Sequence, residues 1–148
     1  MKPKKIIFWA IFAILAYNFF SYSITHSSSE VIAYKRFAKA LLKNDSYVAR
    51  ELTLDRNYAL VVFDQNPARQ KLFGDNTIVF TYYVIKEQRV SDDEQTAYVI
   101  AEQVSRVNPK GQSTVWGTSE VRIVHKVKLV KKNDVWKLES FHDPAMKP

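Results

Sequence analysis

Residues 121–130, with the sequence VRIVHKVKLV, decide the fold of this chain. Apolar side chains recur at every second position, so they share one face of an extended strand. That face consists of Val121, Ile123, His125, Val127 and Leu129. Lysine and arginine occupy part of the opposite face, as in a sheet with one buried and one solvent-exposed side. We expect the apolar face, joined by Trp136 and Leu138, to pack against helices.

Four segments rich in β-branched and aromatic residues predict the strands of one sheet. They are residues 77–86, 96–107, 114–131 and 135–141. Short polar turns separate them, at residues 91–94, 108–111 and 133–134. Gly117 marks a bulge or bend in the third strand. Short turns between consecutive strands predict an antiparallel meander.

Helical spacing precedes the strands. Tyr34, Phe37 and Leu41 lie on one face of an amphipathic helix that ends near Asn44. Ser27 and Glu30 have the spacing of a capping box at its start. Asp45 or Ser46 caps a second, shorter helix through Leu52.

The sequence leaves the secondary structure of the segment before the first strand open. Residues 58–63 form a short apolar run that fits either a strand or a helix. Asn66 and Pro67 begin a helix of one or two turns that stops at Gly74. Helices followed by strands predict an α+β fold, with the helices packed on one face of a curved, mainly antiparallel four-stranded sheet.

An uncharged segment covers residues 6–25. As a helix it is about 30 Å long, which matches the hydrocarbon core of a bilayer. The alternative is a cleaved signal peptide, but Phe19, Phe20 and Tyr22 are too bulky for a good cleavage site. We therefore expect residues 1–25 to form a short tail and a transmembrane anchor, and residues 26–148 to form an exported domain.

Charge sets the expected orientation. Lys2, Lys4 and Lys5 precede the uncharged segment, and the next cationic residue is Lys35. The positive-inside rule then places the N-terminus in the cytoplasm and the domain outside it, periplasmic or extracellular. The expected protein is a single-pass protein of the cell inner membrane.

Composition excludes several classes of site. The chain has 148 residues and no Cys, so disulfides, thiolate metal sites and Cys nucleophiles are excluded. With three Gly it has no glycine-rich phosphate loop. Asp92, Asp93 and Glu94 cluster at a turn but lack the spacing of a calcium loop. We assign no catalytic residue, no metal site and no cofactor.

The order of the predicted elements, and the final strand containing Trp136, resemble the nuclear transport factor-like cone fold over residues 28–141. Within that fold, the chain resembles the periplasmic domains of type IV secretion inner-membrane scaffolds, the VirB-eight family. The shared features are the Asn66-Pro67 turn, Thr96-Ala97-Tyr98-Val99 opening one strand, and Thr114-Val115-Trp116 opening the next. The resemblance implies an anchored scaffold that assembles with other envelope proteins.

The leading hypothesis is accordingly a non-enzymatic, membrane-anchored scaffold or assembly component of a bacterial envelope complex, in secretion or conjugation. The alternative is a small-ligand-binding or isomerase-like protein that uses a cone pocket lined by His125, Tyr83 and Trp116. A lone His on an apolar face is also a common hydrogen-bonded core residue, and no inward carboxylate stands out as a general base. An immunity protein that docks one partner is a third hypothesis.

The first two strands suggest a contact surface. Both of their faces carry apolar residues, and the helices of a small domain cover only one. We expect the other face, bearing Phe80, Tyr82 and Ile100, to form a homodimer or a heteromer. The alternative is that sheet curvature or residues 58–63 bury it.

A basic stretch runs from Arg122 to Lys137 and includes Lys126 and Lys128. It fits either the binding of nucleic acid or anionic head groups, or the charged solvent face of an edge strand, which prevents aggregation. We favour the second interpretation and do not expect nucleic acid as a partner.

Overall fold

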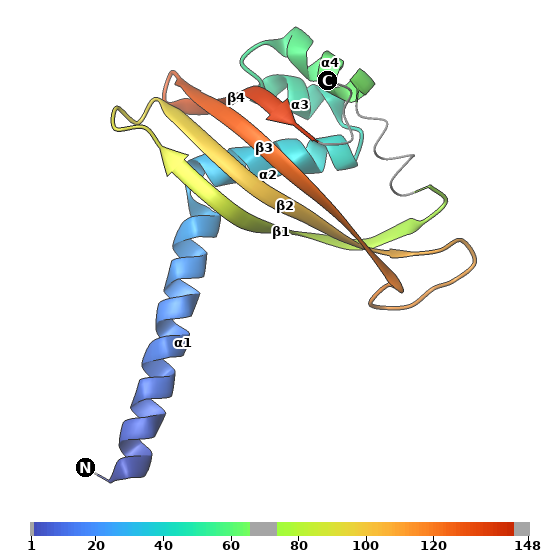
Figure 1. Cartoon of the computed structure of the whole chain (residues 1–148). Coiled ribbons are helices and arrows are strands. Elements are labelled where there is room, and N and C mark those ends of the chain that lie inside the picture. The colour runs from blue at the N-terminus through green and yellow to red at the C-terminus, as the bar shows by residue number, and fades with distance from the viewer. Residues whose placement is uncertain (1, 66–73, 144–148) are drawn as a thin grey trace.

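The computed structural model describes residues 2–65 and 74–143, and it has an α+β architecture (Figure 1). Helix α1, Pro3–Ser27, projects from the domain, and Pro3 to Ser23 is long and apolar enough to cross a membrane. Such a helix is compatible with an anchor or with a signal sequence. The expected helix after Asn66 and Pro67 lies outside the described residues.

Within the described residues, three helices follow α1: α2 at Ser29–Leu42, α3 at Ser46–Leu52 and α4 at Arg56–Gln65. The prediction for α2 is confirmed, because its apolar stripe is the face that the domain buries. Asp45 caps α3 by accepting a hydrogen bond of 3.1 Å from the Val48 backbone N–H. Of the two alternatives for residues 58–63, the helix is the one that forms.

The predicted capping box does not form. Ser27 is the last residue of α1, and Ser28 is the N-cap of α2 without a side-chain cap bond. Residues of the sheet form hydrogen bonds with the start of α2 instead. Trp136 Nε1 donates to Ser29 Oγ at 2.9 Å, and Gln88 Nε2 donates to Glu30 Oε1. Tertiary contacts therefore replace the local cap, which a sequence pattern does not reveal.

The sheet is an antiparallel meander in the order β1-β2-β3-β4. Its strands are β1 Thr77–Val90, β2 Thr96–Asn108, β3 Ser119–Lys132 and β4 Val135–His142. Strand β3 begins at Ser119 and not at residue 114. Gly117 has φ of 73°, and the Thr118 N–H donates to Val107 O, so the chain bends before it joins the ladder.

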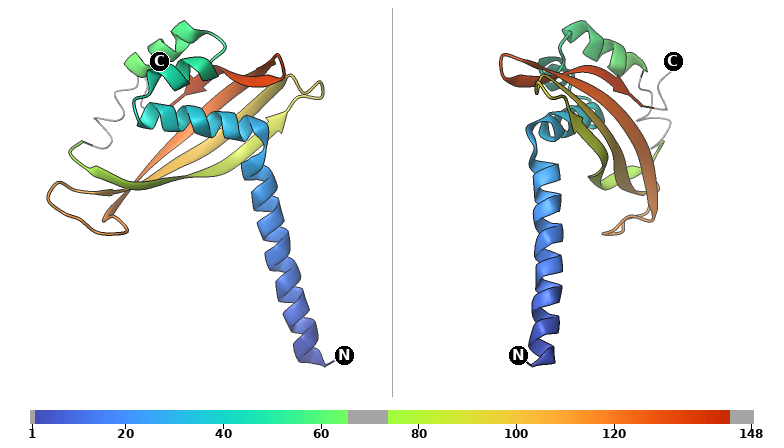
Figure 2. Two further views of the ribbon diagram at one scale, coloured as in Figure 1. Left: turned by 180° about the vertical axis from the view of Figure 1, so that it is seen from behind. Right: turned by 60° about the vertical axis from the view of Figure 1, so that its left-hand side comes forward.

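The helices cover one face of the curved sheet, as predicted (Figure 2). Phe37 of α2 packs on Phe141 of β4, with ring centroids 5.1 Å apart. The inward face of β3 is buried at Val127 and Leu129, and Trp136 and Leu138 join it as expected. We call this side of the sheet the inner face and the side without helices the outer face.

Candidate functional site

A polar cluster lies within the otherwise apolar inner face. His125 of β3 shares a hydrogen bond of 2.9 Å between its Nδ1 and the Tyr34 hydroxyl of α2. Its other ring nitrogen, Nε2, is 3.4 Å from Oδ2 of Asp143, at the end of β4. All three side chains are buried, and His125 is 3% exposed. Helix, central strand and C-terminal strand thus meet at one imidazole.

Tyr83 extends this cluster. Its ring packs edge-on against Tyr34 at 5.8 Å, and its buried hydroxyl has no hydrogen-bond partner among the described residues. Burial raises the pKa of Tyr83 and of Tyr34 above the usual range, and for Tyr34 the neighbouring Tyr83 and Asp143 raise it further. Both phenols therefore stay protonated at neutral pH and act as neutral hydrogen-bonding groups.

The cluster favours a structural role for His125. Both ring nitrogens have protein partners, and the Phe141 ring lies 4.7 Å from the imidazole. A general acid or base needs a free nitrogen within reach of a substrate. The predicted pocket is brought together only in part, because Tyr83 lies near His125 while Trp116 does not. Trp116 is 73% exposed on the β2–β3 loop.

The second feature is an open groove of about 300 Å³ on the outer face. All four strands contribute to its lining, which is Glu87, Arg89, Tyr98, Val99, Ile100, Lys126, Val127, Lys128, Ser140 and His142. The strand register shifts beside the groove, between Ile85 and Glu87 in β1 and at Lys128/Leu129 in the β3–β4 pair. Such bulges increase local twist, and we attribute the hollow to them.

Tyr98 lines the groove and has two cations near its ring. The Arg89 guanidinium lies 5.8 Å from the ring centroid and the Lys128 ammonium lies 5.9 Å from it. The pKa of Lys128 is raised, chiefly by its hydrogen bond to Glu139 at 2.7 Å. Lys126 has no ion-pair partner in the described part of the chain. The groove therefore offers an aromatic ring among cations, one of which is uncompensated.

A ladder of ion pairs crosses the outer face beside the groove. Glu102, nearly buried, contacts Lys86 at 3.4 Å and Arg122 at 2.7 Å. Arg122 also contacts Glu120 at 2.5 Å, and Glu120 contacts Arg106 at 3.6 Å. The hydrogen bond from Arg122 holds the pKa of Glu102 below its usual range.

This ladder divides the outer face that carries the expected contact residues, and the expected homodimer or heteromer stays a prediction. Phe80 and Tyr82 lie together at one end of the outer face, whereas Ile100 lines the groove at the other. Glu102 and Val104 separate Ile100 from Tyr82, because Tyr82 pairs with Val104 across β1 and β2. The two faces of β1 and β2 are apolar in sequence, yet the outer one is divided into an aromatic part and a basic part.

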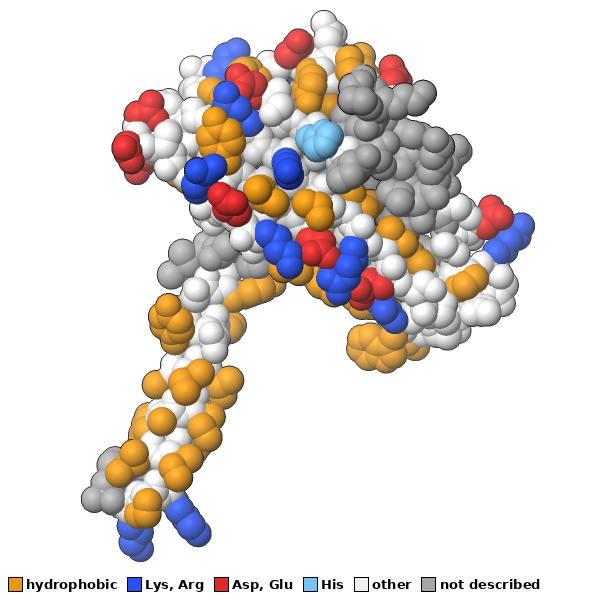
Figure 3. Space-filling model, in the orientation of Figure 1, with side chains coloured by type: hydrophobic (Ala, Val, Ile, Leu, Met, Phe, Trp, Pro, Cys, Tyr) orange, Lys and Arg blue, Asp and Glu red, His pale blue; other side chains and the backbone are white. Residues whose placement is uncertain are grey.

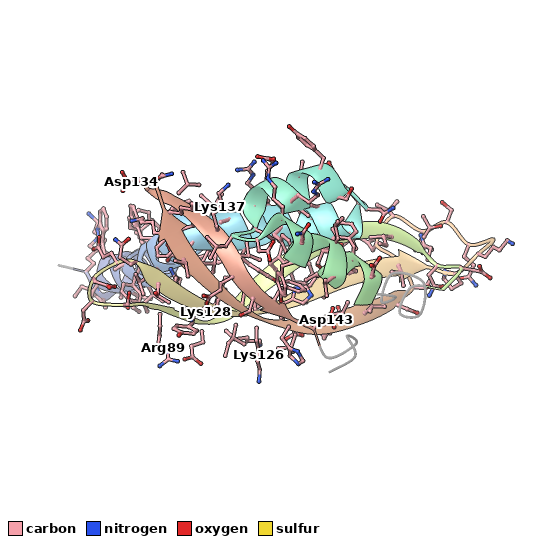
Figure 4. All side chains as sticks on the ribbon, turned by 90° about the horizontal axis from the view of Figure 1, so that it is seen from above. Arg89, Lys126, Lys128, Asp134, Lys137 and Asp143 are labelled. Carbon is pink, nitrogen blue, oxygen red and sulfur yellow. The ribbon has the colours of Figure 1, made fainter. Side chains whose placement is uncertain are left out.

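The basic stretch of β3 and β4 does not form one patch. Lys126 of β3 projects from the outer face, as Arg89 of β1 does, whereas Lys137 of β4 lies toward α3 (Figure 4). There the Lys137 ammonium donates to the Glu51 carbonyl oxygen of α3. Lys137 pairs with Val130, which shares the outer side of β3 with Lys126 and Lys128, so the contact with α3, and not strand alternation, separates Lys137 from them. The expectation that nucleic acid is not a partner stays a prediction. The groove itself was missed, because its cations come from strands distant in sequence.

Comparison with known proteins gives a fold and no family. No protein-family model matches the chain, and no curated protein matches it. Among solved structures, a protein from Streptomyces avermitilis, proposed as a dehydratase of the NTF2-like family, matches with a TM-score of 0.50 and 16% identity, over 81% of this chain and 96% of that one. This match supports an NTF2-like α+β fold.

Two further structures are less similar. An NTF2-like protein of unknown function from Shewanella oneidensis has a TM-score of 0.47 and 13% identity, covering 76% of this chain and 93% of its own. A ketosteroid isomerase-like protein from Erwinia carotovora atroseptica has a TM-score of 0.48 and 12% identity, covering 78% and 92%.

Proposed function

We propose that this protein is a non-enzymatic, membrane-anchored docking component of a bacterial envelope complex, of the secretion or conjugation kind. Helix α1 is the anchor, with the N-terminus in the cytoplasm of the cell and the domain on the other side of the inner membrane. The outer-face groove holds a segment of a partner envelope protein. The observation that carries the proposal is the groove around Tyr98, which is open, aromatic and basic.

The chemistry of the groove specifies the partner segment. Lys126 offers an uncompensated positive charge, and an acidic side chain satisfies it. Tyr98 and Ile100 supply apolar contact area, and aromatic and arginine side chains are typical of the energetic centre of an interface. An extended segment with a carboxylate flanked by apolar residues fits this surface.

A charge reversal with a matched control tests the proposal. Lys126→Glu reverses the charge in the groove, and Lys132→Glu makes the same change on an exposed lysine of the same strand, outside the groove. The tagged full chain, expressed at native level, is purified from detergent extracts of membranes. We expect an envelope protein to copurify with wild type and with Lys132→Glu and to be lost with Lys126→Glu. Recovery of the chain alone, or equal recovery with both variants, contradicts docking in this groove.

The second candidate is a small-ligand-binding or isomerase-like function at the polar cluster. The buried Tyr83 hydroxyl, which lacks a partner in the described residues, is the observation that favours it. A ligand with one hydrogen-bond acceptor would satisfy that hydroxyl. The test is to add hydrophobic carbonyl compounds to the protein in solution and to measure the melting temperature. A rise for wild type but not for Tyr83→Phe would favour this candidate, and equal stabilisation of both proteins would contradict it.

A further inference from the structure

Three aromatic side chains form a contiguous exposed group, which we call the aromatic rim: Phe80 and Tyr82 of β1 and Trp116 of the β2–β3 loop. Phe80 and Tyr82 stack with centroids 6.3 Å apart, and Phe80 meets Trp116 edge-on at 6.5 Å. Phe80 is 38% exposed and Tyr82 is 41% exposed. Neighbouring Val115 is 79% exposed. A cluster of this kind marks a contact surface.

Hydrogen bonds and a glycine hold the β2–β3 loop in the conformation that places Trp116 in the rim. The Arg106 side chain donates to the Trp116 carbonyl oxygen at 3.0 Å and to the Gly117 carbonyl oxygen at 2.9 Å. Gly117 has positive φ, and a Cβ there would lie 3.0 Å from backbone atoms of Val107, so glycine is required for this close approach. Asn108 and Thr114 close the base of the loop with two side-chain hydrogen bonds.

The rim lies on the side of the domain from which α1 departs. Asn18, Ser21 and Tyr22, near the end of the apolar span, line one groove together with Tyr82. In the ribbon views the β2–β3 loop lies at the end of the sheet away from α1, and its tip lies on the same lower side of the domain toward which α1 extends (Figures 1 and 2). Hydrophobic side chains gather along this lower margin of the domain (Figure 3).

We propose that the aromatic rim rests in the interfacial layer of the same membrane that α1 spans, so that the domain is held against the lipid surface. This inference rests on the anchoring part of the proposed function. Tyr and Trp concentrate at the interface because one end of each ring system is apolar and the other carries a polar group. Phe80 and Val115 add apolar area that enters the acyl boundary.

The occupant of the rim is lipid and not a protein because of the anchor. A bilayer that ends at Ser23 of α1 lies next to Tyr82, which shares a groove with Tyr22. The covalent link makes the contact intramolecular, so even a weak affinity is sufficient. The nearby ladder residues Arg106 and Arg122 are paired with glutamates, so the contact does not depend on anionic lipid.

Spin labelling tests the proposal on the full chain, which contains no cysteine. A nitroxide is attached at Val115→Cys, which leaves the three rim rings intact. The control is Tyr47→Cys on α3, where the native side chain is 72% exposed. A third label at Leu15→Cys reports on the anchor. Each protein is reconstituted in phosphatidylcholine vesicles, with and without phosphatidylglycerol, and collisions with oxygen and with a water-soluble nickel chelate are measured.

We expect the label at position 115 to collide more with oxygen than with nickel, with a nickel accessibility several-fold lower than at position 47. Adding Trp116→Ala should move position 115 toward the aqueous values. Aqueous values at 115 with lipid values at 15 overturn the rim proposal and leave the anchor standing. Aqueous values at 15 overturn the anchor and the rim proposal with it. Protection of position 115 from both reagents assigns the rim to a protein contact and also overturns the proposal.

Discussion

Removing the hydroxyl of Tyr34 tests whether the buried cluster holds the domain together. Tyr34→Phe keeps the ring and its edge-on contacts with Tyr83 and His125, at 5.8 and 5.9 Å. It removes one atom, the partner of His125 Nδ1 at 2.9 Å. A buried polar group left without a partner costs about 1–3 kcal/mol of unfolding free energy, more than the roughly 1 kcal/mol net value of the bond itself.

The assay is urea unfolding of the full chain in detergent micelles, followed by tryptophan fluorescence. Trp136 reports folding because its indole is buried and bonded to Ser29. With a urea dependence of about 1–3 kcal/mol/M, a loss of about 2 kcal/mol moves the midpoint by roughly 1 M. The control is Tyr47→Phe, an exposed site at which changes stay within about 0.5 kcal/mol.

If Tyr34→Phe unfolds at the same midpoint as Tyr47→Phe, the hydrogen bond to His125 does not stabilise the fold and the structural interpretation of His125 fails. A midpoint lowered by the expected amount supports it. The chemistry of the substitution makes overpacking irrelevant, because phenylalanine is smaller than tyrosine by the oxygen alone.

Three further outcomes follow from the described contacts. Gly117→Ala should release the β2–β3 loop by forcing strain at positive φ and a clash with Val107, and faster proteolysis of this loop than in Gln112→Ala would show it. The pKa of Glu102 is lowered in the folded state, so the contribution of Glu102 to stability is present above its unfolded pKa and is lost as pH falls. Glu102→Gln should therefore reduce the loss of unfolding free energy with falling pH. An unchanged dependence of unfolding free energy on pH would count against the ion-pair ladder. The pKa of Tyr83 is raised, so its contribution is lost as pH rises above its unfolded value near 10, and absorbance at high pH should show it ionising only with unfolding; ionisation in the native protein would contradict its burial.

The periodicity of apolar residues in the sequence was sufficient to predict which faces of the strands and helices pack together. Alternation in residues 121–130 placed His125 and Leu129 on the buried face, and helical spacing placed Phe37 against the sheet. These patterns work because each depends on one geometric period of a regular element. The same reasoning failed at Ser27, since a capping box is a local pattern and α1 continues through that residue.

The groove could not be predicted in the same way. Its hollow accompanies register shifts near Glu87 and Leu129, and a two-residue period does not show where a bulge lies. One signal was available: Tyr98 in the second strand and Lys128 in the third both lie on the side of their strand opposite the predicted core face, and the meander makes these strands neighbours. The partner of His125 was also hidden, because Asp143 follows the last strand and its alignment depends on the register of β4.

The measurement that tests the central claim most directly is site-specific photo-crosslinking in living cells. The photoreactive residue p-benzoylphenylalanine replaces Tyr98 in the groove or Tyr47 on the exposed surface of α3, in the full chain. Docking in the groove predicts a crosslink to another envelope protein from position 98, absent from position 47 and lost when Lys126→Glu is added. Identical crosslinks from both positions, or none from position 98, would contradict it.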